Sequence, residues 1–119
     1  MFSVMAQKKA GAVIVPPSAF FASQRRHIAE LAAMNRLASI GSSREYAEAG
    51  GLMAYGTNLT ELHRRAATYV DKIFKGARPA DLPVEQPMTF DMVVNLKTAK
   101  ALGLTMPPEI MVRATGVIQ

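Results

Sequence analysis

The sequence contains no cysteine and no tryptophan, and only two of its 119 residues are histidine. Without cysteine, the chain can form neither a disulfide scaffold nor a thiolate metal site, although this absence does not decide the cellular compartment. His27 and His63 lie far apart and match none of the spacings by which paired histidines bind metal. No nucleophile elbow, phosphate-binding loop or dinucleotide fingerprint occurs. We therefore expect no metal, no cofactor and no enzymatic activity.

Long hydrophobic runs are also missing, since none approaches the roughly 20 residues that a membrane-spanning helix needs. One stretch imitates a secretory signal peptide, because Lys8-Lys9 is followed by the apolar and small-residue segment AGAVIVPPSAFFASQ. Pro16 and Pro17 interrupt the apolar run early. We therefore expect no signal peptide in this chain, which as it stands would remain cytoplasmic.

The charge balance is basic, with a formal net charge of +5. Such a balance permits binding to anionic partners, and Arg25-Arg26 and Arg64-Arg65 form two basic pairs. Each pair lies on the polar side of a predicted helix, beside Glu30 or Glu61, and no aromatic residue alternates with it for base stacking. We interpret the pairs as solvated helix faces and expect no binding to nucleic acid.

The clearest periodic pattern predicts a helix from about Leu59 to Lys75. Asn58 and Glu61 have the spacing of a capping pair at its start, and Gly76 is suited to the left-handed position that ends a helix. Apolar residues recur at steps of three and four, which places them on one stripe of the helix. The stripe consists of Leu59, Leu62, Ala66, Tyr69, Val70, Ile73 and Phe74.

Short apolar runs alternate with helical segments elsewhere, which predicts a parallel α/β sheet with right-handed crossovers. Ala12–Val15 is apolar throughout and is expected to be covered on both faces, whereas Thr89–Asn95 alternates and should have one wetter face. The other predicted strands are residues 37–40 and 52–55, and the other predicted helices are residues 2–9, 21–36, 44–49, 96–102 and 107–114.

Ligands of open parallel sheets collect outside the carboxyl ends of the strands. Three such ends are predicted, and they carry hydroxyl groups, an aromatic ring and a guanidinium that could hold a carboxylate. Serine and threonine also cap helices at such positions without any ligand, and an arginine in a first turn often faces solvent. Both interpretations stay open for the candidate ligand-binding residues Pro17, Ser18, Ser42, Ser43, Arg44, Tyr55 and Thr57.

Three phrases carry a family resemblance: SREYAEAGGLMAYG, RRAATYVDKIFKGARPADLPVEQP and NLKTAKALGL. In this order and spacing they resemble the C-terminal part of ABC transporter substrate-binding proteins of the uncharacterised transport-system type. The resemblance covers nearly the whole chain. It implies a periplasmic location and a protein longer than this chain. The implied fold is an incomplete, parallel-sheet, Rossmann-like lobe of a type 1 periplasmic binding protein, with helices on both faces.

The resemblance also implies a function and a domain organisation. Proteins of this type bind a small polar solute between two lobes, here expected to be amino-acid-like, and deliver it to a membrane permease of an ABC importer. By analogy, residues 1–49 and 82–119 belong to the second lobe and residues 50–81 to the first. This chain departs from the usual family pattern at Pro17-Ser18, at Ala38 and at Gly41-Ser42.

Two other interpretations remain open. In the first, the stripe residues Leu59, Leu62, Val70 and Ile73 lack the lobe that they would cover. Burying each of them is worth about 1.5 to 3 kcal/mol. The stripe should then fold back on residues 1–49 or meet its own copy in a homodimer. In the second, the chain is a free-standing α/β regulatory or interaction module.

Overall fold

The computed structural model describes all residues from 1 to 119. Contacts divide the chain into two compact units. We call residues Met1–Gly56 with Asp91–Gln119 the sheet unit, and Thr57–Phe90 the hairpin unit. The assignment of residues 1–49, 50–81 and 82–119 to lobes remains a prediction.

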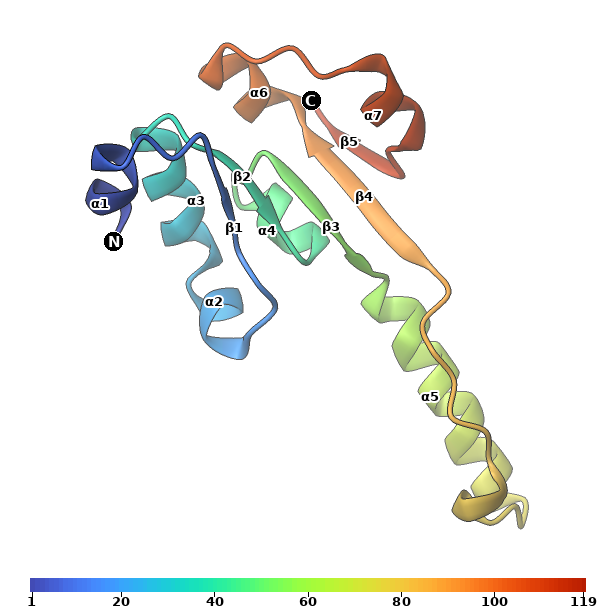
Figure 1. Cartoon of the computed structure of the whole chain (residues 1–119). Helices are drawn as coiled ribbons and strands as arrows, with labels where there is room; N and C mark the ends of the chain where they lie inside the picture. Colours follow the sequence, from blue (N-terminus) through green and yellow to red (C-terminus); the bar gives the residue numbers. More distant parts are fainter. The chain divides into compact units, whose positions relative to one another are not determined.

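The helices and strands are labelled in Figure 1. The elements are α1 (Phe2–Gln7), β1 (Ala12–Ile14), α2 (Ala19–Ser23), α3 (Arg25–Met34), β2 (Ala38–Gly41), α4 (Arg44–Glu48), β3 (Met53–Thr57), α5 (Leu59–Phe74), a 3-10 turn η1 (Pro79–Asp81), β4 (Phe90–Asn95), α6 (Leu96–Leu102), α7 (Pro108–Arg113) and β5 (Gly116–Ile118).

The five strands form one sheet in the order β1-β2-β3-β4-β5. β1, β2 and β3 run parallel to one another, and β4 runs parallel to β5. Between these groups the direction reverses, because Asn95 N–H donates to Leu52 O and Asn58 N–H donates to Thr89 O. The start of β3 therefore lies beside the end of β4. The predicted α/β class is confirmed, and the sheet predicted to be parallel is parallel except between β3 and β4.

The core of the sheet unit centres on β4 and on the helix α4. Val93 and Val94 are successive residues that point to opposite faces of the sheet, and neither has any exposed surface. The wetter face predicted for Thr89–Asn95 is therefore wrong over the second half of the strand. Alternation in sequence shows which residues share a face, but both faces of β4 are covered at this point by other elements.

The prediction that Ala12–Val15 is covered on both faces is also wrong. Val15 is 9% exposed, but Ile14 is 77% exposed. The reason is position, because β1 is an edge strand with β2 as its one neighbour in the sheet. An apolar run reveals a preference for burial, whereas its place in the sheet decides how much cover it receives.

Two local features differ from the predicted elements. The helix expected at residues 21–36 is divided at Gln24 into α2 and α3, and the Ser18 hydroxyl caps the first of them by accepting from Phe21 N–H. The strand β5 was not predicted. It has only three residues, and it pairs in parallel with β4 through the register Val93 to Gly116. So short a strand has no periodicity of its own to detect.

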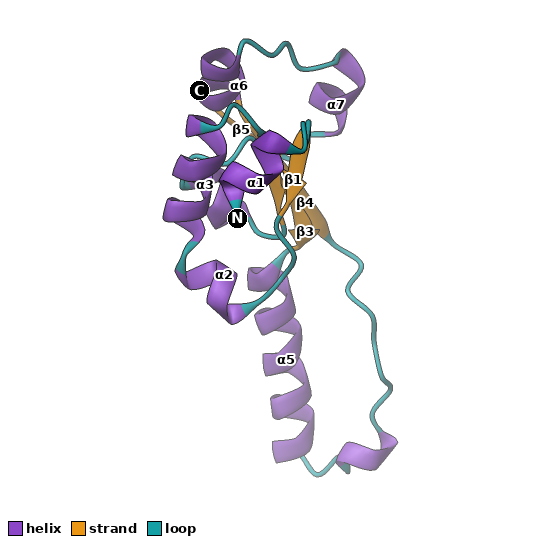
Figure 2. Ribbon diagram, turned by 60° about the vertical axis from the view of Figure 1, so that its left-hand side comes forward, coloured by secondary structure: helices purple, strands orange, loops and turns teal.

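The hairpin unit consists of α5 and a return segment, residues 77–89, that runs back along it (Figure 2). The predicted ends of α5 are confirmed: Asn58 Oδ1 accepts from Glu61 N–H at 2.9 Å, and Gly76 adopts a φ of +104°. The Tyr69 hydroxyl donates to Pro83 O and ties the return segment to the helix. No residue of α5 is buried, so hydrogen bonds and ion pairs rather than a core hold this unit together.

Candidate functional site

The carboxyl ends of β1, β2 and β3 form one edge of the sheet. In the observed register, Ile14 pairs with Ile40 and Ile40 pairs with Met53. Because the three strands are parallel, the residues that follow them continue side by side. This edge therefore brings together the loops that begin at Pro16, at Ser42 and near Tyr55, as the sequence predicts for a parallel sheet.

Gly56 shows how closely two of these loops approach. A Cβ atom at Gly56 would lie 1.9 Å from the backbone carbonyl oxygen of Ser42, a distance that no side-chain movement can relieve. Only glycine fits here, so the backbone after β2 is fixed against the end of β3. Tyr55, which directly precedes Gly56, is 51% exposed at this edge.

The first loop presents Pro17 and Ser18, and both residues are exposed. The Ser18 hydroxyl accepts a hydrogen bond from Phe21 N–H at 3.4 Å and so serves as the cap of α2. Helix capping is thus one role of Ser18 in this structure. A hydroxyl that caps a helix can still donate its hydrogen to a ligand.

The second loop presents Ser42, Ser43 and the helix α4. Arg44 Nε donates to Glu48 Oε1 at 2.9 Å across one turn of α4, and both side chains are about half exposed. An ion pair as exposed as this one contributes little to stability. The Arg44 guanidinium can therefore leave Glu48 and bind another carboxylate in its place. Backbone hydrogen bonding and the Ser43 hydroxyl lower the pKa of Glu45, which keeps a negative charge beside Arg44.

Gly116, at the start of β5, joins this edge although sequence reasoning missed it. A Cβ at Gly116 would lie 3.3 Å from the Nη1 atom of Arg44. The guanidinium therefore rests near the backbone of β5. Within the sheet unit, the structure gathers six of the seven predicted residues at one edge: Pro17, Ser18, Ser42, Ser43, Arg44 and Tyr55. Thr57, the seventh, is the half-buried last residue of β3 and belongs to the hairpin unit.

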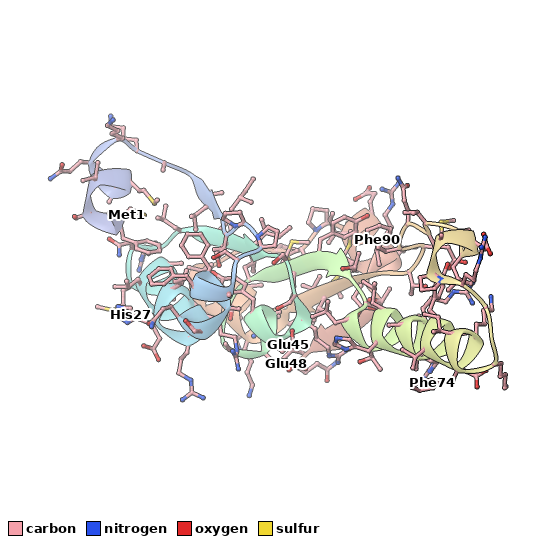
Figure 3. All side chains as sticks on the ribbon, turned by 90° about the horizontal axis from the view of Figure 1, so that it is seen from below. Met1, His27, Glu45, Glu48, Phe74 and Phe90 are labelled. Atoms are coloured by element: carbon pink, nitrogen blue, oxygen red, sulfur yellow. The ribbon has the colours of Figure 1, made fainter.

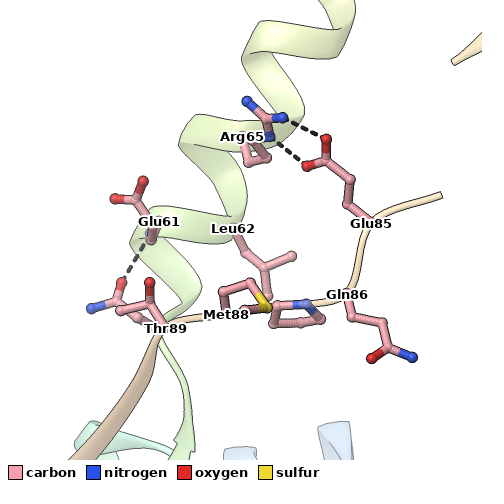
Figure 4. A pocket seen from close by; sticks show the side chains of 9 residues that line it. Glu61, Leu62, Arg65, Glu85, Gln86, Met88 and Thr89 are labelled. Atoms are coloured by element: carbon pink, nitrogen blue, oxygen red, sulfur yellow. Dashed lines mark hydrogen bonds and ion pairs between the residues drawn. The ribbon is translucent and has the colours of Figure 1, made fainter. Parts of the chain in front are cut away.

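A pocket of about 330 Å³ lies within the hairpin unit, between the first turns of α5 and the end of the return segment (Figure 4). Sequence reasoning missed it, because its two walls are at least 20 residues apart in the chain and carry no motif. Across the pocket, Arg65 donates from Nε to Glu85 Oε2 at 2.6 Å and from Nη2 to the other carboxylate oxygen. Leu62 and Met88 supply apolar wall.

A second, more open groove of about 480 Å³ continues along α5. Its floor is the apolar stripe of the helix and its far wall is the return segment. The groove is lined chiefly by Leu62, Ala66, Tyr69, Ile73, Pro79, Leu82, Pro83 and Val84, with Arg65 and Glu85 at one end.

The ion pair between Arg65 and Glu85 makes the hairpin unit sensitive to acid. Hydrogen bonds from Arg65 lower the pKa of Glu85 from 4.5 to about 2. Because the folded pKa lies below the unfolded one, the pair stabilises the hairpin at pH values above the unfolded pKa. This contribution is lost as the pH falls through about 2.

We expect a titration of the Glu85 carboxyl carbon by NMR to give a midpoint near pH 2. In Arg65→Gln the midpoint should rise towards 4.5, the ordinary value. The matched control is Arg78→Gln. This substitution removes the ion pair between Arg78 and Asp81, which lies within the return segment and does not involve Glu85. It should leave Glu85 unchanged. A wild-type midpoint equal to that of Arg65→Gln would show that the ion pair with Arg65 does not lower the pKa of Glu85.

The structure contains no group of three or more histidine, cysteine, aspartate or glutamate residues that could hold a metal ion. It also contains no helix of the length and apolarity that crossing a membrane requires.

Comparison with solved structures finds the same fold in much longer proteins. A crystal structure of a conserved domain protein from Vibrio cholerae matches with a TM-score of 0.88 at 25% identity, over 98% of this chain and 39% of that chain. The ABC domain in complex with L-Trp from Streptococcus pneumoniae matches with a TM-score of 0.87 at 29% identity, over 98% and 39%. A ligand-free, open substrate-binding protein with adhesive properties from Clostridium difficile matches with a TM-score of 0.71 at 25% identity, over 99% and 39%.

This chain thus spans about two fifths of the length of these solved proteins. No curated protein matches its sequence. The family model for ABC transporter substrate binding proteins matches residues 1–118, which is nearly the whole chain. On that match the chain belongs to the family of ABC transporter substrate binding proteins.

Proposed function

We propose that this chain forms part of the solute-binding component of an ABC-type importer and supplies one wall of a site for a small polar solute. The observation that carries the proposal is the convergence of the loops after β1, β2 and β3 in a member of a substrate-binding family. The edge that they form offers hydroxyl groups, an exposed tyrosine ring and a guanidinium whose present partner is an exposed carboxylate.

The solute in this proposal is amino-acid-like. A neighbour with 29% identity is solved in complex with L-Trp, which favours that class. Arg44 would hold the carboxylate of such a solute with two hydrogen bonds, and Tyr55 would contact its side chain. Ser42 and Ser43 lie at the same edge, where their hydroxyls can bind polar groups. The role is binding rather than catalysis.

The partners and the location follow from the same role. A binding component of an importer delivers its solute to a membrane permease, and we propose such a permease as the partner of the complete protein. Its place of action would be the periplasm. Tight binding in a two-lobed protein requires both lobes to close on the solute. The chain covers 39% of its solved relatives, so we expect it alone to bind weakly, with a dissociation constant of about 1 mM or higher.

The test is an NMR titration of the 119-residue chain with L-tryptophan, followed by other L-amino acids. We expect saturable shifts of backbone amides at Ser18, at residues 42–44 and at Tyr55. Arg44→Ala should reduce the shifts at least several-fold, because it removes the proposed carboxylate partner. Arg113→Ala, which removes a cation at the end of α7, is the matched control and should leave them intact. No saturable shift with any amino acid would contradict the proposal and favour an interaction module.

A second candidate role is self-association through the apolar stripe of α5. Leu59, Leu62, Val70 and Ile73 are between 38% and 49% exposed. Phe74, at the end of the helix, is 86% exposed (Figure 3). We propose that these side chains are covered by a second copy in a homodimer, because exposed apolar patches of this kind favour association.

A further inference from the structure

Gly116 is a glycine whose backbone conformation accepts any residue. It is the first residue of the strand β5, and its φ is not among the positive values that favour glycine, which occur at Gly50, Gly76 and Gly103. Within a strand, glycine weakens the structure, because it loses more conformational entropy and packs no side chain. What distinguishes this position is therefore the space beside it.

The register of β5 places Gly116 beneath the first residue of α4. Gly116 pairs with Val93, and Ile118 packs against a buried cluster that contains Val93 and Ala47 of α4. Residues two apart on a strand share a face. Gly116 therefore lies on the face of β5 that α4 covers, and Arg44, one turn before Ala47, reaches it.

The Arg44 guanidinium presents its end to this position. A Cβ at Gly116 would lie 3.3 Å from Nη1 and 3.6 Å from Nη2 of Arg44, and 3.5 Å from Cγ2 of Val93. The hydrogen bond to Glu48 Oε1 is donated by Nε, on the side of the guanidinium. Glu48 thus leaves both Nη atoms to bind another acceptor, and a carboxylate that binds there need not displace Glu48.

We propose that Gly116 is a positioning residue of the solute site, because its missing side chain keeps the Nη1–Nη2 end of Arg44 open for the carboxylate of the solute. This inference rests on the solute-binding role proposed above and specifies how the carboxylate is held. A carboxylate accepts two parallel hydrogen bonds from an arginine, each about 2.7 to 2.9 Å long. A side chain at residue 116 would occupy the space beside these donors and turn the guanidinium away.

The same geometry narrows the class of solute. Two Nη donors side by side match the two oxygens of a free carboxylate. An amide offers a single acceptor oxygen, and its NH2 group can only donate, so it would meet one of the Nη donors with another donor. We therefore expect the site to require a free carboxylate on the solute.

Side-chain size at residue 116 is the test. In Gly116→Val, the NMR shifts induced by L-tryptophan should grow about tenfold more slowly with concentration, because a lost hydrogen bond to a charged group weakens binding by about this factor. Gly116→Ala adds one methyl group and should give an intermediate loss. Val117→Ala, which alters the next residue on the opposite face of β5, at a position 41% exposed, is the control and should leave the shifts unchanged.

Three further measurements separate the positioning role from a structural one. Urea denaturation should show no loss of stability in Gly116→Val, because valine suits a strand better than glycine. The Nε–Hε NMR signal of Arg44, recorded without solute, should move in Gly116→Val and stay in place in Val117→Ala. L-tryptophan amide, which lacks the carboxylate, should give no saturable shifts with the wild type.

The inference and the solute-binding role fail separately. If no amino acid gives saturable shifts with the wild type, the solute-binding role is overturned. An unmoved Arg44 signal in Gly116→Val overturns the contact between residue 116 and the guanidinium, whatever the solute result. Equal binding by the wild type and Gly116→Val, or equal binding of L-tryptophan and its amide, would place the carboxylate elsewhere. If Gly116→Val loses stability, the same comparisons are decided by Gly116→Ala.

Discussion

Gly51→Ala is expected to lower the free energy of unfolding by about 3 kcal/mol, the upper range for forcing an extra methyl group into a packed core. The added Cβ would lie 2.1 Å from Cε1 of Tyr46, and the ring cannot move aside because Tyr46 is only 3% exposed. Gly41 approaches the same ring, where a Cβ would lie 2.4 Å from Cγ. The ring of Tyr46 is thus held against two glycines.

Urea denaturation followed by circular dichroism measures this effect. Gly11→Ala is the matched control, because a Cβ at Gly11 meets nothing within 4 Å. That variant should change the free energy of unfolding by less than about 0.5 kcal/mol. If Gly51→Ala and Gly11→Ala have the same stability, the close packing of Tyr46 against the backbone is not what holds α4 on the sheet.

The second large effect is expected for Asn95→Ala, which should also cost about 3 kcal/mol. Asn95 is 5% exposed. Its Nδ2 donates to Ala47 O at 2.8 Å, and its Oδ1 accepts from Thr98 N–H at 3.1 Å at the start of α6. The side chain thus joins α4 to α6. Alanine would leave a buried carbonyl and a helix N–H without their partners.

Asn58→Ala offers a matched comparison, because Asn58 also caps a helix by accepting from the N–H three residues on. Asn58 lies at the start of α5, in a unit without buried helix residues. We expect its replacement to cost about 1 kcal/mol, the usual value for an N-cap. Equal losses for the two variants, measured by the same urea denaturation, would show that Asn95 acts only as a cap and not as a buried link.

Gly51 and Asn95 both act on the candidate site through α4. Tyr46 and Ala47 are the buried face of this helix, and its first residue is Arg44. Fixing the helix by Gly51 and Asn95 therefore fixes the guanidinium at the edge where the loops meet. Variants that loosen α4 should reduce the solute-induced NMR shifts as well as stability, whereas Gly11→Ala and Asn58→Ala should leave those shifts unchanged.

The sequence could predict most elements of this chain because their signals are local. Three predicted features depend on residues within one or two turns, and the structure has all of them: the capping pair Asn58 and Glu61, the stop at Gly76 and the helix at residues 96–102. The parallel arrangement of β1, β2 and β3 also followed from the alternation of strands and helices. That arrangement in turn placed Ser18, Ser42, Ser43, Arg44 and Tyr55 at one edge.

Other features had no local signal. Gly116 joins the site because β5 pairs with β4, and a three-residue strand forms only where a neighbour offers hydrogen bonds. The pocket beside Arg65 depends on Glu85, which is 20 residues away and meets the arginine only after the chain turns back. The exposure of Ile14 depends on its place at the sheet edge and not on its hydrophobicity.

By itself, then, the sequence determined where most helices and strands lie and which residues share a helix face. These depend on backbone preferences and on periodicity, which act over a few residues. The tertiary structure alone decided which strands become edges, which faces are buried, and which distant charges meet. Those outcomes depend on contacts between segments far apart in the chain, and such contacts form only when the whole sheet is assembled.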